Sequence, residues 1–230
     1  MEISAVALFG ARSMKPVRYF DDPEIGPARE TSHPRFVDLA RDEFYYDCTD
    51  DFSPFGSDDG SDALSALEEW FQEGGKEKHV SKFLKQLLRN WGFGIPKNMI
   101  VADSEAKERW LSADEMHGTY LQAECRARVA AAFGQLKITG NVDSEILHEG
   151  LSALRCQLWL NNRSRELHPN WKHADAEHEN LVKMSTVLGL AVSVRPKPSP
   201  LWLVSRSSSN FWSKHDVIGI KSAATTRTMA

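Results

Sequence analysis

The stretch that most constrains the fold is a long helical pattern from Asp114 to Ile138, which carries apolar residues on two sides. Both apolar stripes contain many small residues. They consist of Met116, Tyr120, Ala123, Ala127, Ala130 and Gly134 on one side and of Leu121, Cys125, Val129, Ala132, Phe133 and Leu136 on the other. A helix that is apolar on more than one side must be covered by other elements, and small side chains let those elements approach closely. We therefore expect this helix to be the central rod of the core.

Further helices are predicted wherever apolar residues recur every three or four positions. Pro34 predicts the start of a short helix after Ser32 or His33. Gly74 and Gly75 separate two longer helices, which we expect to pair as an αα-hairpin. The predicted longer helices are 63–71, 78–91, a segment carrying Ala106 and Trp110, 143–160 and 174–190. Between them we expect a short extended connector at 99–102 and a polar loop at 161–173.

These elements predict a mainly α-helical protein with one globular domain, built from helical hairpins over residues 30–192. Before this domain, residues 1–29 contain Pro and Gly turn formers and predict an irregular lead-in, with a short strand at 3–9. After it, residues 193–230 are rich in Pro, Ser and basic residues. That composition predicts a loosely ordered tail.

The composition, with 41% hydrophobic and 26% charged residues, is typical of a soluble globular protein. No uncharged apolar run approaches the roughly 18 residues that a membrane helix needs. Since the first residues also lack the basic region of a secretory signal, we expect a cytoplasmic protein with no membrane partner. Cys48, Cys125 and Cys156 are widely spaced and form no CxxC motif, which predicts free thiols.

Charge is distributed unevenly along the chain, although the net charge is only −4. From Asp38 to Glu73 there are twelve acidic residues and one basic residue, Arg41, whereas fourteen basic residues face eight acidic ones from Arg126 onward. The acidic half would repel nucleic acid and favours a basic partner, a cation or contact with the basic half. Nucleic acid is the weaker interpretation and falls on the tail, where Trp202, Arg206, Trp212 and Lys214 interleave.

The acidic half is densest from Asp47 to Asp62, a segment that we call the aspartate loop and that holds six aspartates in sixteen residues. Turn formation and capping of the following helix account for much of this composition. The predicted caps are Asp59, Ser61 or Asp62. Four aspartates are not explained in that way, because they would face each other across Pro54-Phe55-Gly56. They are Asp50 and Asp51 on one side and Asp58 and Asp59 on the other.

A divalent cation is one alternative occupant of this loop, because Ca²⁺ and Mg²⁺ prefer carboxylate oxygens. The ligands would be Asp50, Asp51, Asp58, Asp59 and Asp62. The EF-hand template fits poorly, since Pro54-Phe55 interrupts it and the bidentate Glu is missing. We therefore expect no cofactor, with a cation as the only one considered.

Other catalytic or metal signatures do not emerge from the sequence. A polar cluster of His168, His173, Asp175, Glu177, His178 and Glu179 matches no established metal spacing, and a solvated helix start explains it equally well. His148-Glu149 begins like HExxH, but Ser152 stands where the second histidine is required. There is no G-x-S-x-G elbow and no phosphate-binding glycine loop. No catalytic residue is predicted.

Two parts of the sequence resemble a bacterial family of conserved uncharacterised proteins, described as YfeS-like or as molybdate-metabolism regulators. They are His33-Pro34 through Trp70, which includes the run from Asp50 to Asp62, and the run from Ala132 to Gly140. The resemblance covers about residues 30–160 and implies a bacterial cytoplasmic protein. Some members of the family contain a WGR domain, whereas this chain has Trp91-Gly92-Phe93.

We predict from these observations a non-enzymatic bacterial regulatory or protein-interaction module. Its partner would be a protein with a basic surface, bound by Asp50, Asp51, Asp58 and Asp59. Two alternatives stay open. One is a hydrolase that uses the same carboxylates to hold Mg²⁺ or Ca²⁺, and the other is an immunity-type binding protein.

Overall fold

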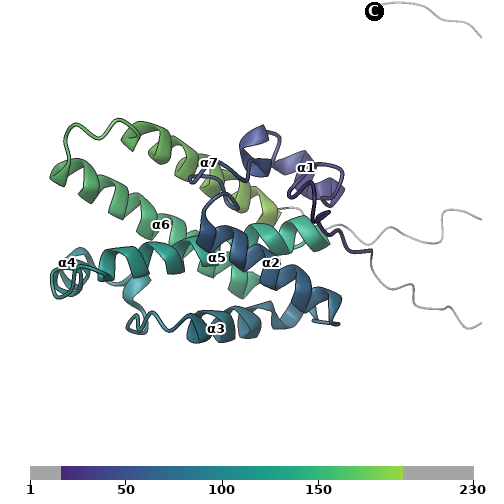
Figure 1. The fold of residues 1–230 in the computed structure, drawn as a ribbon, viewed down its shortest axis with the longest axis horizontal. Coiled ribbons are helices and arrows are strands. Elements are labelled where there is room, and N and C mark those ends of the chain that lie inside the picture. The colour runs from purple at the N-terminus through teal and green to yellow at the C-terminus, as the bar shows by residue number, and fades with distance from the viewer. Residues whose placement is uncertain (1–16, 194–230) are drawn as a thin grey trace, which may run out of the picture. The chain divides into compact units, whose positions relative to one another are not determined.

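The computed structural model describes residues 17–193, and every regular element in that part of the chain is helical (Figure 1). The α-helices are α1 (Pro34–Leu39), α2 (Asp58–Gln72), α3 (Val80–Trp91), α4 (Ser104–Leu111), α5 (His117–Thr139), α6 (Ser144–Leu167) and α7 (Ala174–Ser193), and the short 3-10 helices are η1 (Glu43–Tyr46), η2 (Glu77–His79) and η3 (Met99–Val101). The predicted mainly α fold is confirmed. The strand expected at 3–9 and the tail from 194 onward lie outside the described residues.

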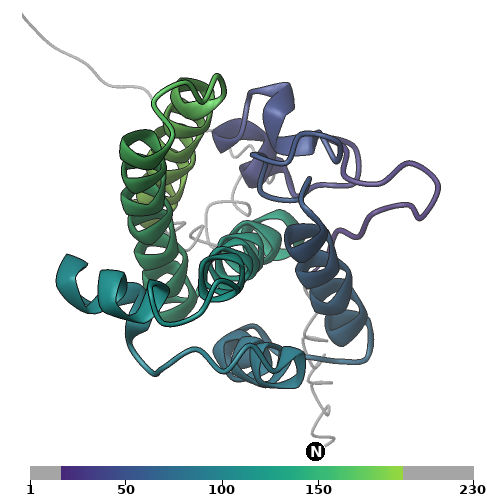
Figure 2. The same cartoon turned by 60° about the vertical axis from the view of Figure 1, so that its left-hand side comes forward.

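Helix α5 is the central element, as its two apolar stripes predict. Helices α2, α3 and α6 pack around it (Figure 2), and residues 129–139 are all buried. Small residues let the neighbours come close: a Cβ on Gly134 would lie 3.0 Å from Leu67 of α2, and one on Gly150 of α6 would lie 2.7 Å from Ala132. No helix within residues 17–193 combines the length and the apolar character that crossing a membrane requires.

Hairpins connect the helices on one side of α5. Helices α5 and α6 are joined by the short turn after Gly140, which adopts a left-handed φ of 72°, and α6 and α7 form the next hairpin. The predicted pair 63–71 and 78–91 is present as α2 and α3. These two helices touch through the rings of Trp70 and Phe83, 5.1 Å apart, but both pack mainly on α5.

The predicted polar loop at 161–173 is wrong over its first seven residues, because α6 continues to Leu167. The polar side chains of this turn find partners on α7: the Asn161 amide donates to Ala174 O at 3.0 Å, and Arg165 pairs with Asp175 at 2.6 Å. The helix ends at Leu167, and its C-cap is His168, the residue before Pro169. A residue before proline is driven away from helical geometry.

Two shorter predictions are also wrong. Residues 99–101 form η3 instead of an extended connector, because Asn98 turns the chain with a φ of 72° and Ile100 is drawn into the core. Helix α2 begins at Asp58, so Asp59, Ser61 and Asp62 lie inside it and do not cap it. The actual N-cap is Ser57, whose hydroxyl accepts from the Gly60 N–H at 3.2 Å.

The irregular segment 17–33 closes the carboxyl end of α5. The Tyr19 N–H donates to Ile138 O at 3.1 Å, and the His33 N–H donates to Lys137 O at 2.8 Å. Both carbonyls belong to the last turn of the helix and have no partner within it. The lead-in therefore supplies the hydrogen bonds that the end of α5 lacks.

Lys137 connects three elements beneath this cap. Its side chain is fully buried, and its ammonium group lies 2.6 Å from Asp21 of the lead-in and 3.2 Å from Glu68 of α2. An ammonium group can be buried at such a place only with charged partners, since desolvation of an unpaired ion costs several kcal/mol. Burial raises the pKa of Glu68 despite the attraction of Lys137.

Candidate functional site

The aspartate loop is held together mainly by bonds from side chains to its own backbone. The Ser53 hydroxyl donates to Asp47 O at 2.6 Å, and the Asp50 carboxylate accepts from the Phe52 N–H at 2.9 Å. Phe55, only 2% exposed, anchors the loop in the core. The loop is therefore a fixed feature of the surface, with turn chemistry that its Ser and Asp residues predict.

Two glycines let the loop fold back on itself. A Cβ on Gly56 would lie 2.1 Å from the carbonyl oxygen of Asp50, and one on Gly60 would lie 2.7 Å from that of Pro54. Neither contact can be relieved by turning a side chain, because the obstructing atoms belong to the backbone. The two ends of the loop are thus brought together by close backbone packing at Gly56 and at the first turn of α2.

The predicted site aspartates fall into two groups. Asp50 is engaged in its turn, and Asp59 lies 3.7 Å from Arg126 of α5. Burial raises the pKa of Asp59, while Arg126 opposes that shift. Asp51, Asp58 and Asp62 are exposed and form no ion pair within residues 17–193. The latter three therefore present free negative charge to the solvent.

Within the described part of the chain, no three His, Cys, Asp or Glu side chains come together in a way that could hold a metal ion. This statement includes the five aspartates proposed as ligands and the polar cluster from His168 to Glu179. The residues of that cluster do other things. Asp175 pairs with Arg165, the His173 ring lies 6.3 Å from Phe52, and the Nδ1 atom of His178 is buried without a hydrogen-bond partner among residues 17–193.

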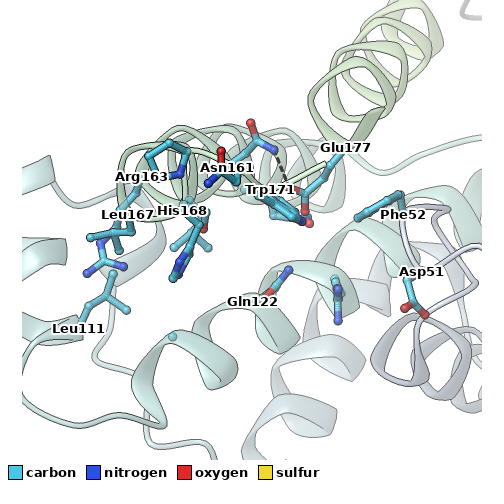
Figure 3. A pocket seen from close by; sticks show the side chains of 17 residues that line it. Asp51, Phe52, Leu111, Gln122, Asn161, Arg163, Leu167, His168, Trp171 and Glu177 are labelled. Atoms are coloured by element: carbon cyan, nitrogen blue, oxygen red, sulfur yellow. Dashed lines mark hydrogen bonds between the residues drawn. The ribbon is translucent and has the colours of Figure 1, made fainter. Parts of the chain in front are cut away.

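Beside the aspartate loop lies an open groove of about 870 Å³ (Figure 3). Its floor comes from α5 and α6, the connection at 168–171 and Glu177 of α7 line it further, and Asp51 and Phe52 at the tip of the aspartate loop reach into it. Amide side chains are prominent in the lining. They are Gln122 of α5, Gln157 and Asn161 of α6, and Asn170 of the connection that follows α6. This volume is in the range of ligand-binding clefts.

Glu177 is the most unusual residue of the groove, since it is a carboxylate that is only 7% exposed. One of its oxygens accepts from the Asn161 amide at 2.6 Å. The orientation of that amide is set on both sides, because its nitrogen also donates to Ala174 O at 3.0 Å and its oxygen accepts from Arg165 at 2.8 Å. Asn161 therefore holds Glu177 in place.

The charged side chains that line the groove differ in whether they have an ion-pair partner. Arg126 is close to Asp59 at 3.7 Å, and Arg163 binds Glu108 at 2.8 Å. Glu177 has no ion-pair partner within residues 17–193, and in Figure 3 its carboxylate points into the groove with Phe52 and Trp171 to either side of it in this view. The cationic groups of the groove thus have anions beside them, whereas its buried anion has no cation.

Only one edge of this site was predictable from the sequence. Asp51 and, in the polar cluster, His168 and Glu177 were candidate residues, but nothing in the sequence places the aspartate loop beside the segment 168–179. Phe52 comes from the first of these segments, and Trp171 and Glu177 come from the second. The one available signal was local: an aromatic residue, Phe52 or Trp171, lies close to acidic residues in each segment.

The free thiols predicted from the cysteine spacing are confirmed for all three positions. Cys125 of α5 and Cys156 of α6 are buried and interact with each other, and burial raises the pKa of Cys125. Cys48 is exposed in the aspartate loop. None of the three lines the groove.

Fold and site define an all-α protein with an acidic loop beside a polar and aromatic groove, within the described residues. The chain is 35% identical over 137 residues to an uncharacterised protein, YfeS, of Escherichia coli strain K12. The aligned part covers 59% of this chain and 54% of that protein, so the chain spans about half the length of the curated relative. No family model matches the sequence, and no solved structure matches it. The resemblance to YfeS is thus supported, whereas the molybdate-regulator label finds no support in this comparison.

Proposed function

We propose that the protein is a non-enzymatic interaction module that binds a basic surface of a partner protein through the aspartate loop. The observation that supports this best is the free negative charge on a rigid loop. Asp51, Asp58 and Asp62 are exposed and without ion pairs among residues 17–193, while Ser53, Phe55 and Gly56 hold the backbone that carries them. A fixed arrangement of charge loses little entropy on binding.

The four aspartates named from the sequence have different roles in this proposal. Asp51 and Asp58 face the solvent and contact the partner directly. Asp50 and Asp59 act indirectly, because Asp50 stabilises the turn and Asp59 is tied to Arg126. Asp62, one turn further along α2, extends the charged surface. Binding is therefore expected to depend most on Asp51, Asp58 and Asp62.

Electrostatic attraction would act at a distance as well as in contact. The segment from Asp38 to Glu73 carries twelve acidic residues against Arg41, and such a field speeds the encounter with an oppositely charged protein. Mobile ions screen this field over about 8 Å at physiological ionic strength. The association rate should therefore fall steeply when salt is raised, while dissociation changes less.

The test is affinity capture from a bacterial lysate at low and high salt, followed by quantitative mass spectrometry. The immobilised protein is compared with a variant carrying Asp51→Asn, Asp58→Asn and Asp62→Asn. A matched control replaces by amides three exposed carboxylates that lie outside the aspartate loop and do not line the groove, and so changes the net charge equally. These are Glu30, Glu115 and Glu166.

Basic proteins retained at low salt by the unaltered chain and by the control, but lost with the loop variant, are the expected result. If all three baits retain the same proteins in the same amounts, the loop is not the binding surface. If the control loses them as well, attraction is due to net charge and the proposal fails.

A further inference from the structure

We infer that the groove beside the aspartate loop receives an arginine side chain from a basic segment of the partner, with the guanidinium group on Glu177 between Phe52 and Trp171. This rests on the proposed function and assigns the anchoring contact within it. Three independent features of the groove support this inference. They are a largely buried carboxylate without an ion-pair partner among residues 17–193, two aromatic side chains that line the same groove, and arginines that already have anions beside them.

One oxygen of the Glu177 carboxylate is available to a donor from outside residues 17–193. Glu177 is 7% exposed and receives one hydrogen bond, from Asn161, while its other oxygen receives none from residues 17–193. Burying a carboxylate without a counter-charge is costly unless further donors complete its hydrogen bonds. The protein nevertheless fixes Glu177 in position, since Ala174 O and Arg165 orient the amide that holds it. Such a carboxylate is a preformed acceptor for a cation.

The surroundings of Glu177 favour a guanidinium group over an ammonium group. A guanidinium is planar, donates several hydrogen bonds in one plane and stacks on aromatic faces, whereas an ammonium is a compact and strongly hydrated point charge. Phe52 and Trp171 line the groove together with Glu177 (Figure 3). Cations over aromatic rings gain about 0.5–2 kcal/mol, and more when they are desolvated.

The remaining lining suits the peptide backbone that would accompany the arginine. Gln122 and Gln157 each offer an amide donor and acceptor, and the groove volume of about 870 Å³ exceeds that of a single side chain. Arg126 and Arg163 do not make the groove repulsive, because Asp59 and Glu108 lie beside them at 3.7 and 2.8 Å. Asp51 adds a further carboxylate at the rim. The local field thus complements a basic segment.

The inference is tested with labelled dodecapeptide pools of random neutral residues and lysines, each with one fixed central position. That position is arginine, lysine or citrulline, a neutral isostere of arginine. Binding to the full chain is measured by fluorescence anisotropy for the unaltered protein, Glu177→Gln, Phe52→Leu and the pair Asp58→Asn with Asp62→Asn. Circular dichroism verifies that each variant is folded.

The arginine pool should bind about tenfold more tightly than the citrulline pool, corresponding to one charge-assisted contact. Glu177→Gln should abolish that ratio, and Phe52→Leu should reduce it several-fold. The pair at Asp58 and Asp62 should weaken every pool by a similar factor at low salt and leave the ratio unchanged. Phe52→Leu retains an apolar residue of similar size, so it carries the test if Glu177→Gln does not fold.

Two failures can be told apart. An arginine-to-citrulline ratio near one in the unaltered chain, or a ratio that Glu177→Gln leaves intact, overturns the arginine anchor even if basic pools still bind through the loop. Unchanged affinities for the pair at Asp58 and Asp62 overturn the proposed function instead. If no pool binds to the unaltered chain, the arginine anchor is overturned.

Discussion

Among single substitutions in the ion-pair cluster of Asp21, Glu68 and Lys137, replacing Lys137 by Met should be the most destabilising. The ammonium group is fully buried, and the side chains of Asp21 and Glu68 that contact it are only 11% and 12% exposed. Removing the cation leaves two buried carboxylates close together, and breaking such a pair costs about 3–5 kcal/mol. For a domain of this size that corresponds to a fall in Tm of roughly 10 °C or more.

The assay is urea unfolding followed by circular dichroism, at neutral pH and again under mildly acidic conditions. The pKa of Glu68 is already raised by burial, and without Lys137 it should rise further. A carboxylate with a raised pKa in the folded state contributes stability that is present at low pH and lost as pH rises through that pKa. The deficit of Lys137→Met should therefore shrink on acidification.

A triple variant separates charge from packing. Lys137→Met combined with Asp21→Asn and Glu68→Gln removes all three charges while keeping the side-chain volumes similar, so most of the lost stability should return. A single variant that loses less than about 1 kcal/mol, or a deficit that grows on acidification, would refute the ion-pair reasoning.

Further predictions concern residues at the edge of the acidic surface and elsewhere in the helices. Tyr46→Phe should stabilise the protein by about 1 kcal/mol in thermal unfolding, because the Tyr46 hydroxyl is buried without a hydrogen-bond partner among residues 17–193. A loss of stability would show that this hydroxyl is hydrogen-bonded. The same burial raises the pKa of Tyr46 to about 12, so the stability lost by the unaltered protein between pH 10 and 12 should be reduced in this variant. Gly56→Ala should lower the free energy of unfolding by about 1–3 kcal/mol in urea, since its Cβ would lie 2.1 Å from Asp50 O. Gly189→Ala in α7 should instead raise that free energy by a few tenths of a kcal/mol to about 1 kcal/mol, because nothing lies near its Cβ. Equal effects of the two substitutions would contradict the close packing of the loop.

The central helix shows what a sequence pattern can predict. Two apolar stripes rich in small residues, between Met116 and Leu136, required neighbours on more than one side, and α2, α3 and α6 supply them. Helix ends follow local chemistry where that chemistry is strong. Gly92 and Gly140 both end helices with positive φ, and Asp103 caps α4.

Predictions failed where the decisive partner is distant in the sequence. The stretch beginning at Asn161 is polar and was expected to form a loop, yet its side chains are satisfied by Ala174, Asp175 and Glu177 on α7, and it remains helical. The residues around Lys137 in the sequence give no sign that its side chain is buried. Its partners Asp21 and Glu68 are 116 and 69 residues away.

The candidate site was predictable only in part for the same reason. The aspartate loop could be recognised from composition, and its turn chemistry follows from local Ser, Asp and Gly residues. Whether a given carboxylate is free depends on long-range contacts, as Asp59 with Arg126 and Glu177 with Asn161 show. A groove built from stretches as far apart as 51–52, 118–126 and 157–177 leaves no periodic signal in the sequence.

We propose that the aspartate loop and the adjoining groove together form one binding surface for a basic segment. The most direct test of this claim is a ¹H–¹⁵N correlation spectrum of the full chain, titrated with the arginine peptide pool. The account predicts that the indole N–H of Trp171 and backbone amides within Asp47–Asp62 shift together, with one midpoint. If these signals stay in place while others move, or if loop and groove titrate separately, the claim is contradicted.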